Sequence, residues 1–307
     1  VIGGEITATY AIVSWLASAL IPHYAWRIMW LLGLPTGLLL ILLNRWIPES
    51  PRFLLARGRL AEAEAVLRRF GAKLVDIGDT VAEAVPGRGR FTRINAGGLA
   101  GRTTLIVLLG IGIGFVTYGF QLWIPSNLQK LGFGEAASDT LLRNSALIGY
   151  PFTFVAAWLY GFWSSKKTII AVTALTVLSL VGFVSLGDGV TRHSTLLTVL
   201  LAVPMLGSGT LVALLGAYTS EVYPTPVRSR GSGLAAGVSK AGGVVIIALT
   251  ALAIAAPSIR ATALVASVPL VLAVGAIVLF GVETSGRRLD DISVAVSLAT
   301  ARATGAV

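Results

Sequence analysis

The chain alternates long apolar stretches with short charged ones, and this pattern predicts its secondary structure. Eight stretches of 17 to 28 residues contain no Asp, Glu, Lys or Arg. A helix needs roughly 20 apolar residues to cross a bilayer core of about 30 Å, so each stretch predicts one transmembrane helix of an all-α integral membrane protein. Transmembrane β-barrels are excluded, because their strands are about ten residues long and alternate in polarity. The expected spans are 3–22, 26–46, 103–125, 142–163, 168–187, 195–219, 233–256 and 261–283.

The segment between the second and third spans, 47–101, is too charged to cross a membrane. From Ala56 to Phe70 its apolar residues recur at helical spacing, and Glu64 and Arg68 form an i, i+4 pair in the favourable order. This predicts a short amphipathic helix on the membrane surface. Residues 76–98 contain several glycines, one proline and scattered charges, which is typical of a flexible linker.

Basic residues are distributed unequally between the two sides of the membrane that these spans define. Of the 24 Lys and Arg residues, 18 fall on the side of loop 47–101 and the C-terminus. Because Lys and Arg concentrate in cytoplasmic loops, we expect this loop and the C-terminus to be cytoplasmic in a multi-pass protein of the plasma (inner) membrane. The net charge of +10 follows from this topology, so we expect no nucleic-acid partner.

Composition narrows the class of function. Only 12% of the residues are charged, about half the usual share in a soluble protein. Without cysteine, the chain cannot form disulfides, cysteine zinc sites or a cysteine nucleophile. The spans contain no paired acids and no nucleophile with a base, so we expect neither an enzyme nor a cofactor or metal. The expected partners are membrane lipid, a small-molecule substrate and protons, and the expected state is a monomer.

Three motifs stand at membrane edges. They read Pro48-Glu49-Ser50-Pro51-Arg52 after the second span, Glu221-Val222-Tyr223-Pro224-Thr225-Pro226-Val227-Arg228 after the sixth, and Glu283-Thr284-Ser285-Gly286-Arg287 after the last. In order and position they resemble the motifs after helices 6, 10 and 12 of sugar-porter-type members of the major facilitator superfamily. The resemblance implies that the spans are family helices 5–12 of an N-terminally truncated chain that begins at Val1. It divides the chain into two helices of the first half (1–46), an inter-half loop (47–101), the six-helix second half (102–284) and a tail (285–307).

The chain departs from the sugar-porter pattern in two places. Phe162 stands where the family has an Asp before its basic pair, here Lys166-Lys167, and Ser164 and Ser165 replace part of the usual Arg-x-Gly. The third span reads Tyr-Gly-Phe-Gln-Leu-Trp-Ile-Pro over 118–125, without the paired glutamines of sugar porters. This pattern is similar to the synaptic-vesicle-glycoprotein-like and the aromatic-acid or niacin-type symporters.

The resemblance also implies a gate at the cytoplasmic helix ends. Glu221 is expected to pair with Lys166, Lys167 or Arg228 when the transporter is open to the outside, and to release them when it opens inward. Glu49 and Arg52 either do the same or cap the amphipathic helix. The alternative for all six residues is a set of static surface charges.

Candidate substrate contacts lie within the spans. Lys240 is the basic residue inside a span, about 10 Å along a helix counted from Gly233, and it either faces a cavity that binds a carboxylate or extends to the headgroups. Tyr118 and Gln121 share one helix face, with Trp123 nearby for ring stacking and Pro125 expected to break the helix beyond them. Asn144 is a weaker candidate. Glu5 is either a proton carrier or an edge residue.

These residues predict a secondary active transporter of a small polar or anionic organic solute that works by alternating access. Coupling to protons is expected from the resemblance alone. Two alternatives stay open. One is a sugar transporter of the same superfamily, and the other is a membrane sensor that keeps the scaffold without transport.

Overall fold

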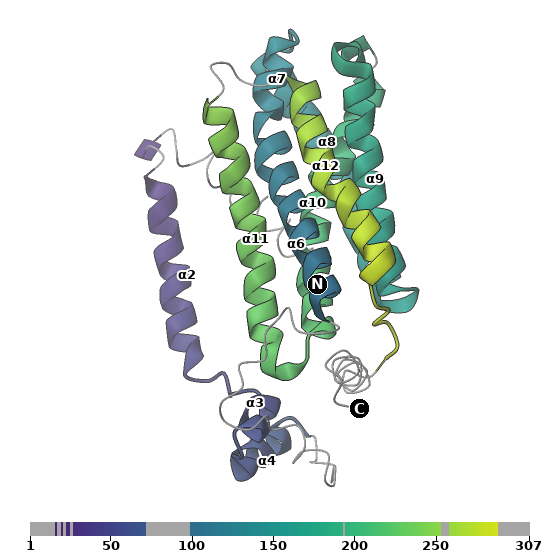
Figure 1. Ribbon diagram of the computed structural model, residues 1–307. Helices are drawn as coiled ribbons and strands as arrows, with labels where there is room; N and C mark the ends of the chain where they lie inside the picture. The colour runs from purple at the N-terminus through teal and green to yellow at the C-terminus, as the bar shows by residue number, and fades with distance from the viewer. Residues whose placement is uncertain are drawn as a thin grey trace. The chain divides into compact units, whose positions relative to one another are not determined.

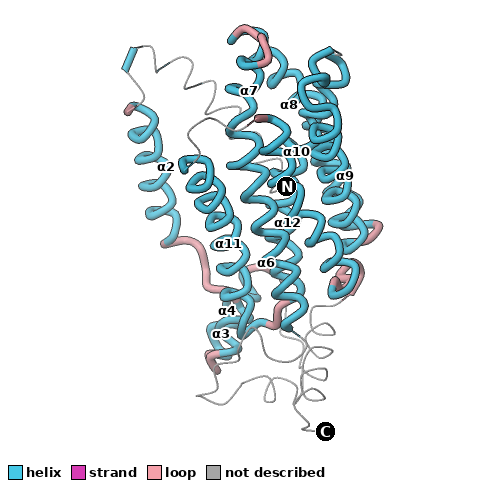
Figure 2. Tube along the Cα trace, turned by 45° about the horizontal axis from the view of Figure 1, so that its top comes forward, coloured by secondary structure: helices cyan, strands magenta, loops and turns pink. Residues whose placement is uncertain are grey.

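The structure is a computed structural model, and it describes residues 27–71, 99–192, 194–252 and 258–287, with residues 16, 20, 23 and 24 as isolated positions. Within these ranges all regular elements are helices (Figures 1 and 2). The chain divides into two compact units, one of residues 10–92 and one made of the rest. The span expected at 3–22 lies almost entirely outside the described residues.

The smaller unit contains α2 (Ile28–Asn44), α3 (Pro51–Ala56) and α4 (Leu60–Arg69). One amphipathic helix was expected from Ala56 to Phe70, and the expected first residue was wrong. Gly58 has a φ of +74°, a left-handed conformation that ends α3 and that glycine adopts without strain, so the second helix begins at Leu60. The expected ion pair is present, with Arg68 2.7 Å from Glu64.

The larger unit begins with α6 (Ala100–Gly114), which continues through a π-helix, η2 (Phe115–Phe120), and a 3₁₀ turn, η3 (Gln121–Trp123), into α7 (Ile124–Lys130). The remaining elements are α8 (Glu135–Phe162), α9 (Ser165–Leu186), the 3₁₀ helix η4 (Gly187–Arg192), α10 (Ser194–Val222), α11 (Thr225–Leu252) and α12 (Ile259–Phe280). Helix α6 packs against α10, α11 and α12, and α9 packs against α8, α10 and α12. Figures 1 and 2 show α11, α6, α12 and α9 side by side.

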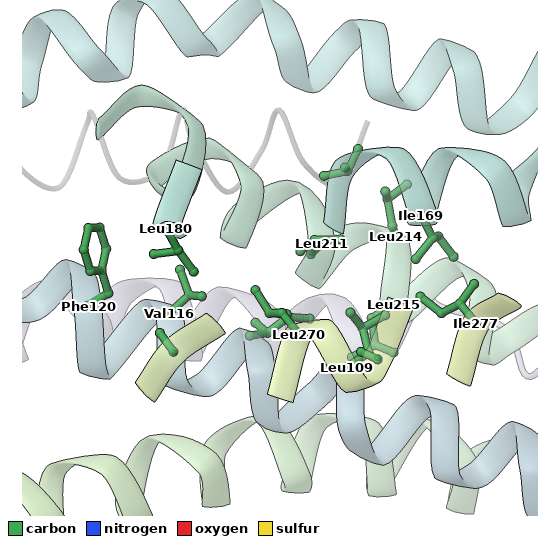
Figure 3. Close-up of a cluster of buried hydrophobic side chains, with 14 of the residues drawn as sticks. Leu109, Val116, Phe120, Ile169, Leu180, Leu211, Leu214, Leu215, Leu270 and Ile277 are labelled. Carbon is green, nitrogen blue, oxygen red and sulfur yellow. The ribbon is translucent and has the colours of Figure 1, made fainter. Parts of the chain in front are cut away.

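Large apolar side chains fill the centre of this bundle (Figure 3). Leu109 comes from α6, Phe120 from η2, Ile169 from α9, Leu215 from α10 and Leu270 from α12, and all five are buried. The ring of Phe120 lies 5.2 Å from that of Phe183 on α9. Residues from four separate helices thus form one core, while apolar residues on the outer helix faces stay exposed.

Among the residues that the structure describes, five helical segments are long and apolar enough to cross a membrane. They are Ala100–Lys130, Ser165–Leu186, Ser194–Val222, Val227–Leu252 and Ile259–Phe280. The span expected at 26–46 appears as a shorter apolar helix, Trp30–Asn44, and the span expected at 142–163 lies within α8, of which Pro151–Phe162 is an apolar part. The all-helical membrane fold is therefore confirmed, and the count of eight spans stays a prediction.

Candidate functional site

The first candidate region lies where α6 loses its regular α-helical form. The backbone N–H of Gln121 donates to the carbonyl of Val116, five residues back, and Pro125 stands in the first turn of α7. The break expected at Pro125 was therefore placed too late, because the irregular backbone begins at Phe115. Proline has no N–H to offer the carbonyl four residues back, and its ring crowds that carbonyl, so the turns before Pro125 adopt other hydrogen bonds.

Glycines bring α11 against the end of α6 and the irregular segment that follows it. A Cβ atom at Gly242 would lie 2.9 Å from the carbonyl oxygen of Ile111, and one at Gly243 would collide with the ring of Tyr118. A Cβ atom at Gly114 would in turn meet the backbone of α11. Small residues allow membrane helices to approach this closely, and here the approach places Tyr118 beside α11.

Two of the predicted substrate contacts meet in this region. The Lys240 ammonium group donates to the hydroxyl of Tyr118 at 2.8 Å and lies 5.4 Å from the centre of its ring. The Lys240 side chain is exposed and Tyr118 is half-buried. Because α11 begins at Thr225 rather than Gly233, Lys240 lies near the middle of its helix, about 20 Å from either end at 1.5 Å per residue. The expected depth of about 10 Å was therefore too small.

The other predicted contacts differ in their surroundings. Gln121 donates through its side-chain nitrogen to the Pro204 carbonyl at 2.7 Å and to the Ser208 hydroxyl at 2.8 Å, both on α10. The indole N–H of Trp123 is buried without a hydrogen-bond partner in the described structure, an arrangement that costs free energy. Asn144 is exposed on α8, and no described contact links it to Tyr118 or Lys240.

A second candidate region collects polar groups at the helix ends that carry the sequence motifs. Glu283, just after α12, accepts hydrogen bonds from the hydroxyl groups of Ser164 and Ser165 and from the backbone N–H groups of Ser165 and Ser285. Partial burial alone would raise the pKa of this carboxyl. The hydrogen bonds from Ser164, Ser165 and Ser285 outweigh burial and lower the pKa to about 2.

Glu221 joins the same region through hydroxyl groups rather than a cation. Its Oε2 accepts from the Tyr160 hydroxyl at 2.7 Å and from the Thr284 hydroxyl at 2.6 Å. The expected cationic partners have other contacts: Lys166 donates to the Val278 carbonyl at 3.0 Å, Lys167 lies over the Trp163 ring, and Arg228 Nε donates to the Tyr223 carbonyl at 3.3 Å. In this conformation neutral donors take the place of the expected pairing of Glu221 with Lys166, Lys167 or Arg228.

The first motif lies in the smaller unit. Ser50, rather than Glu49, occupies the N-cap position of α3, and Arg52 is the second residue of that helix. Glu49 is exposed, and its charge, after that of Glu62, raises the pKa of Arg59. Glu5 lies outside the described residues.

Sequence reasoning missed the neutral members of the second region, Tyr160, Ser164, Ser165 and Thr284. One signal was available, because Ser164 and Ser165 were already noted as departures from the Arg-x-Gly of the resembled family. Their roles as carboxylate ligands follow only from the packing of α9 against the end of α12.

Fold and regions together define a multi-pass membrane protein whose polar side chains gather at mid-helix and at one set of helix ends. The family described as "Sugar (and other) transporter" matches residues 4–296, and the chain belongs to this family. The resemblance to the major facilitator superfamily is thereby confirmed.

Relatives with assigned names are transporters. The chain is 28% identical to the niacin transporter NiaP of Acinetobacter baylyi over 91% of this chain and 65% of that protein. It is 31% identical to the inner membrane metabolite transport protein YgcS of Escherichia coli over 72% of this chain and 48% of that protein. It is 29% identical to the human putative transporter SVOPL over 90% of this chain and 61% of that protein. The chain thus spans less than two thirds of the length of each.

A solved structure of similar fold is that of the proton:xylose symporter XylE bound to 6-bromo-6-deoxy-D-glucose. The TM-score is 0.66 with 22% identical residues, over 94% of this chain and 63% of that chain. At this identity the likeness concerns the fold alone.

Proposed function

We propose that this protein is a secondary active transporter of a small organic carboxylate, driven by a proton gradient. The observation that carries the substrate class is the position of Lys240 at the middle of α11, bound to Tyr118. A cation at this depth is costly in hydrocarbon and marks a solute pathway or a counter-ion. The name of the niacin transporter relative supports a carboxylate, and proton coupling is the driving force named for the symporter of similar fold.

In this proposal the polar residues near Lys240 complete the solute site. The ammonium group attracts the carboxylate, and the Tyr118 hydroxyl orients the ammonium. The unpartnered indole N–H of Trp123 offers a donor that a solute oxygen would satisfy. Gln121 commits its amide nitrogen to α10, so its carbonyl oxygen is the atom that contacts solute. Asn144 and Glu5 remain candidates for a solute contact and a proton carrier.

The test is substrate binding and uptake by the protein in its complete reading frame, purified and placed in liposomes. Niacin serves as the charged probe and nicotinamide as its neutral counterpart. Lys240→Ala should weaken niacin binding more than tenfold, about 1.4 kcal/mol, while nicotinamide binding barely changes. Lys240→Arg should retain part of the affinity, because the charge stays while its geometry changes. Lys130→Ala, at the exposed end of α7, is the matched control.

The outcomes separate this proposal from its alternatives. Niacin accumulation that collapses when the proton gradient is dissipated supports a symporter. Binding without uptake favours the sensor, and uptake of xylose without niacin favours a sugar transporter. Equal sensitivity of niacin and nicotinamide to Lys240→Ala would exclude a carboxylate site at this lysine.

The proposal includes the orientation and the gate. Loop 47–101 and the C-terminus face the cytoplasm of a monomeric protein in the plasma (inner) membrane. Glu221, Lys166, Lys167 and Arg228 close the solute pathway at that side, together with Glu49 and Arg52. Support comes from the charge asymmetry and from the contacts of Glu221 with α8 and with the segment after α12.

A further inference from the structure

Two neighbouring helices of the larger unit present apolar outer faces. Helices α9 and α12 pack against each other and lie side by side (Figure 1), and both are long and apolar enough to span a bilayer. Leu178 on α9 is 66% exposed and Leu279 on α12 is 76% exposed. In a bilayer, acyl chains cover such faces, so the ends of the two helices lie at the level of the lipid headgroups.

Positive charge gathers where α9 begins and α12 ends. Lys166 and Lys167 are the second and third residues of α9, and the Lys166 ammonium donates to the Val278 carbonyl at 3.0 Å, which brings it across to α12. The Lys167 ammonium lies 5.5 Å from the centre of the Trp163 ring, which is 53% exposed. Each ammonium group has three N–H donors, so both lysines keep donors beyond these contacts.

The carboxylates at this set of helix ends do not neutralise the two lysines. Glu221 and Glu283 accept from hydroxyl and backbone donors instead, and no described carboxylate forms an ion pair with either lysine. Ammonium groups held at a membrane edge in this way attract anions from their surroundings. The anions that stand at this level of a bilayer are the phosphate groups of lipids.

We propose that Lys166 and Lys167 bind the headgroup of an anionic phospholipid whose acyl chains lie along the outer faces of α9 and α12. The phosphate oxygens accept from both ammonium groups, and the indole of Trp163 packs beside the headgroup, as amphipathic rings do at the membrane interface. Basic groups between membrane helices bind anionic headgroups. A zwitterionic headgroup offers the same phosphate but adds a cation that the two lysines repel, so the anionic lipid is preferred.

The lipid site is independent of the solute and of transport. Lys166 and Lys167 also belong to the proposed gate, so a change of uptake in their variants would have two explanations. The test therefore measures lipid binding alone, and a failure of either proposal leaves the other open.

The test is quenching of tryptophan fluorescence by brominated lipids, with the protein in its complete reading frame placed in phosphatidylcholine vesicles. Each protein is measured beside its own Trp163→Phe variant, so that the difference is the emission of Trp163. Brominated phosphatidylglycerol is compared with brominated phosphatidylcholine at equal mole fractions. One lysine near an anionic headgroup contributes about fivefold to binding. Wild type should therefore prefer phosphatidylglycerol by more than about fivefold, and Lys166→Ala/Lys167→Ala should lose this preference.

Arg260→Ala is the matched control. Arg260 is exposed at the opposite end of α12, where its Nε donates to the Val184 carbonyl of α9 at 2.6 Å, so it bridges the same two helices as Lys166 does. This variant should keep the preference at Trp163. If the double variant does not fold, Lys167→Ala alone, which removes one exposed charge, should lower the preference about fivefold.

Three results would overturn the proposal. One is equal quenching of Trp163 by the two lipids in wild type, which would also be seen if another part of the protein covered the site. Another is an equal loss of preference in Arg260→Ala and in the double lysine variant. The third is displacement of brominated phosphatidylglycerol by inorganic phosphate at constant ionic strength, because the lysines would then bind free phosphate rather than lipid.

Discussion

Glu283 and its neutral donors show how single residues hold the end of α12. Ser164 serves two purposes, because its Oγ donates to Glu283 and also accepts from the Lys167 backbone N–H at 3.0 Å as the N-cap of α9. Tyr218 secures the next residue back, donating to the Val282 carbonyl at 3.0 Å and accepting from its N–H at 2.7 Å. The chain after α12 is thus attached to both α9 and α10.

The depressed pKa of Glu283 predicts a loss of stability in acid. A carboxyl whose pKa falls from 4.5 to about 2 on folding stabilises the folded state above pH 4.5, and this contribution disappears as the pH falls towards 2. We expect Glu283→Gln to unfold at lower temperature than the wild type near neutral pH, and the difference to shrink in acid. Thermal unfolding in detergent at several pH values measures this.

Glu62→Gln is the control for that experiment. Glu62 is an exposed carboxylate in the first turn of α4, paired with Arg59 at the N-cap of that helix, and surface pairs of this kind contribute little to stability. Its substitution should leave the unfolding temperature nearly unchanged. A pH dependence in Glu283→Gln equal to that of the wild type would show that the hydrogen bonds of Glu283 do not favour its ionised form.

At the scale of helices, the close approach of α11 to α6 and the π-helix after it determines where Lys240 and Tyr118 meet. The carbonyl of Ile111 and the ring of Tyr118 occupy the space that side chains at Gly242 and Gly243 would need. Without this close packing, the Lys240 ammonium would not reach the Tyr118 hydroxyl.

The contact predicts opposite effects for two glycines of α11. Gly242→Ala should destabilise the protein by about 1–3 kcal/mol, as overpacked cores do, because its Cβ would lie 2.9 Å from the Ile111 carbonyl oxygen. Gly237→Ala, in the same helix with open space around it, should be neutral or stabilising by up to about 1 kcal/mol. Thermal unfolding of both variants provides the comparison, and equal effects would contradict the close packing.

The helices were predictable from the sequence where their existence depends only on the length of an uncharged, apolar stretch. The five long helices follow from uncharged stretches, and the Glu64–Arg68 pair from spacing within one helix. The π-helix of Phe115–Phe120 and the start of α4 were not, because they depend on local backbone geometry around Pro125 and Gly58. The candidate residues Tyr118 and Lys240 were found separately by their chemistry. Their contact could not be predicted, because the two residues are 122 positions apart in the chain and meet only through the packing of their helices.

At the scale of the whole molecule, the charge asymmetry predicts the proposed orientation in the membrane. Because the chain has no cysteine, a single introduced cysteine is the sole thiol of the protein, and its labelling reports on which side of the membrane it lies. A membrane-impermeant maleimide applied to intact cells should label Gln129→Cys, at the exposed end of α7, and should not label Glu62→Cys until the membrane is permeabilised. Labelling of Glu62→Cys in intact cells would reverse the proposed topology.

The hydroxyl and backbone donors around Glu283 have a consequence for the effect of salt. Ions in solution screen pairs of opposite charges at a surface over a Debye length of about 8 Å at physiological ionic strength. Contacts between a carboxylate and neutral donors, made at 2.6 to 3.0 Å and partly buried, contain no cation for an anion to compete for. The junction of α9 with the end of α12 should therefore withstand shifts in ionic strength that would loosen a junction built from lysine–glutamate pairs.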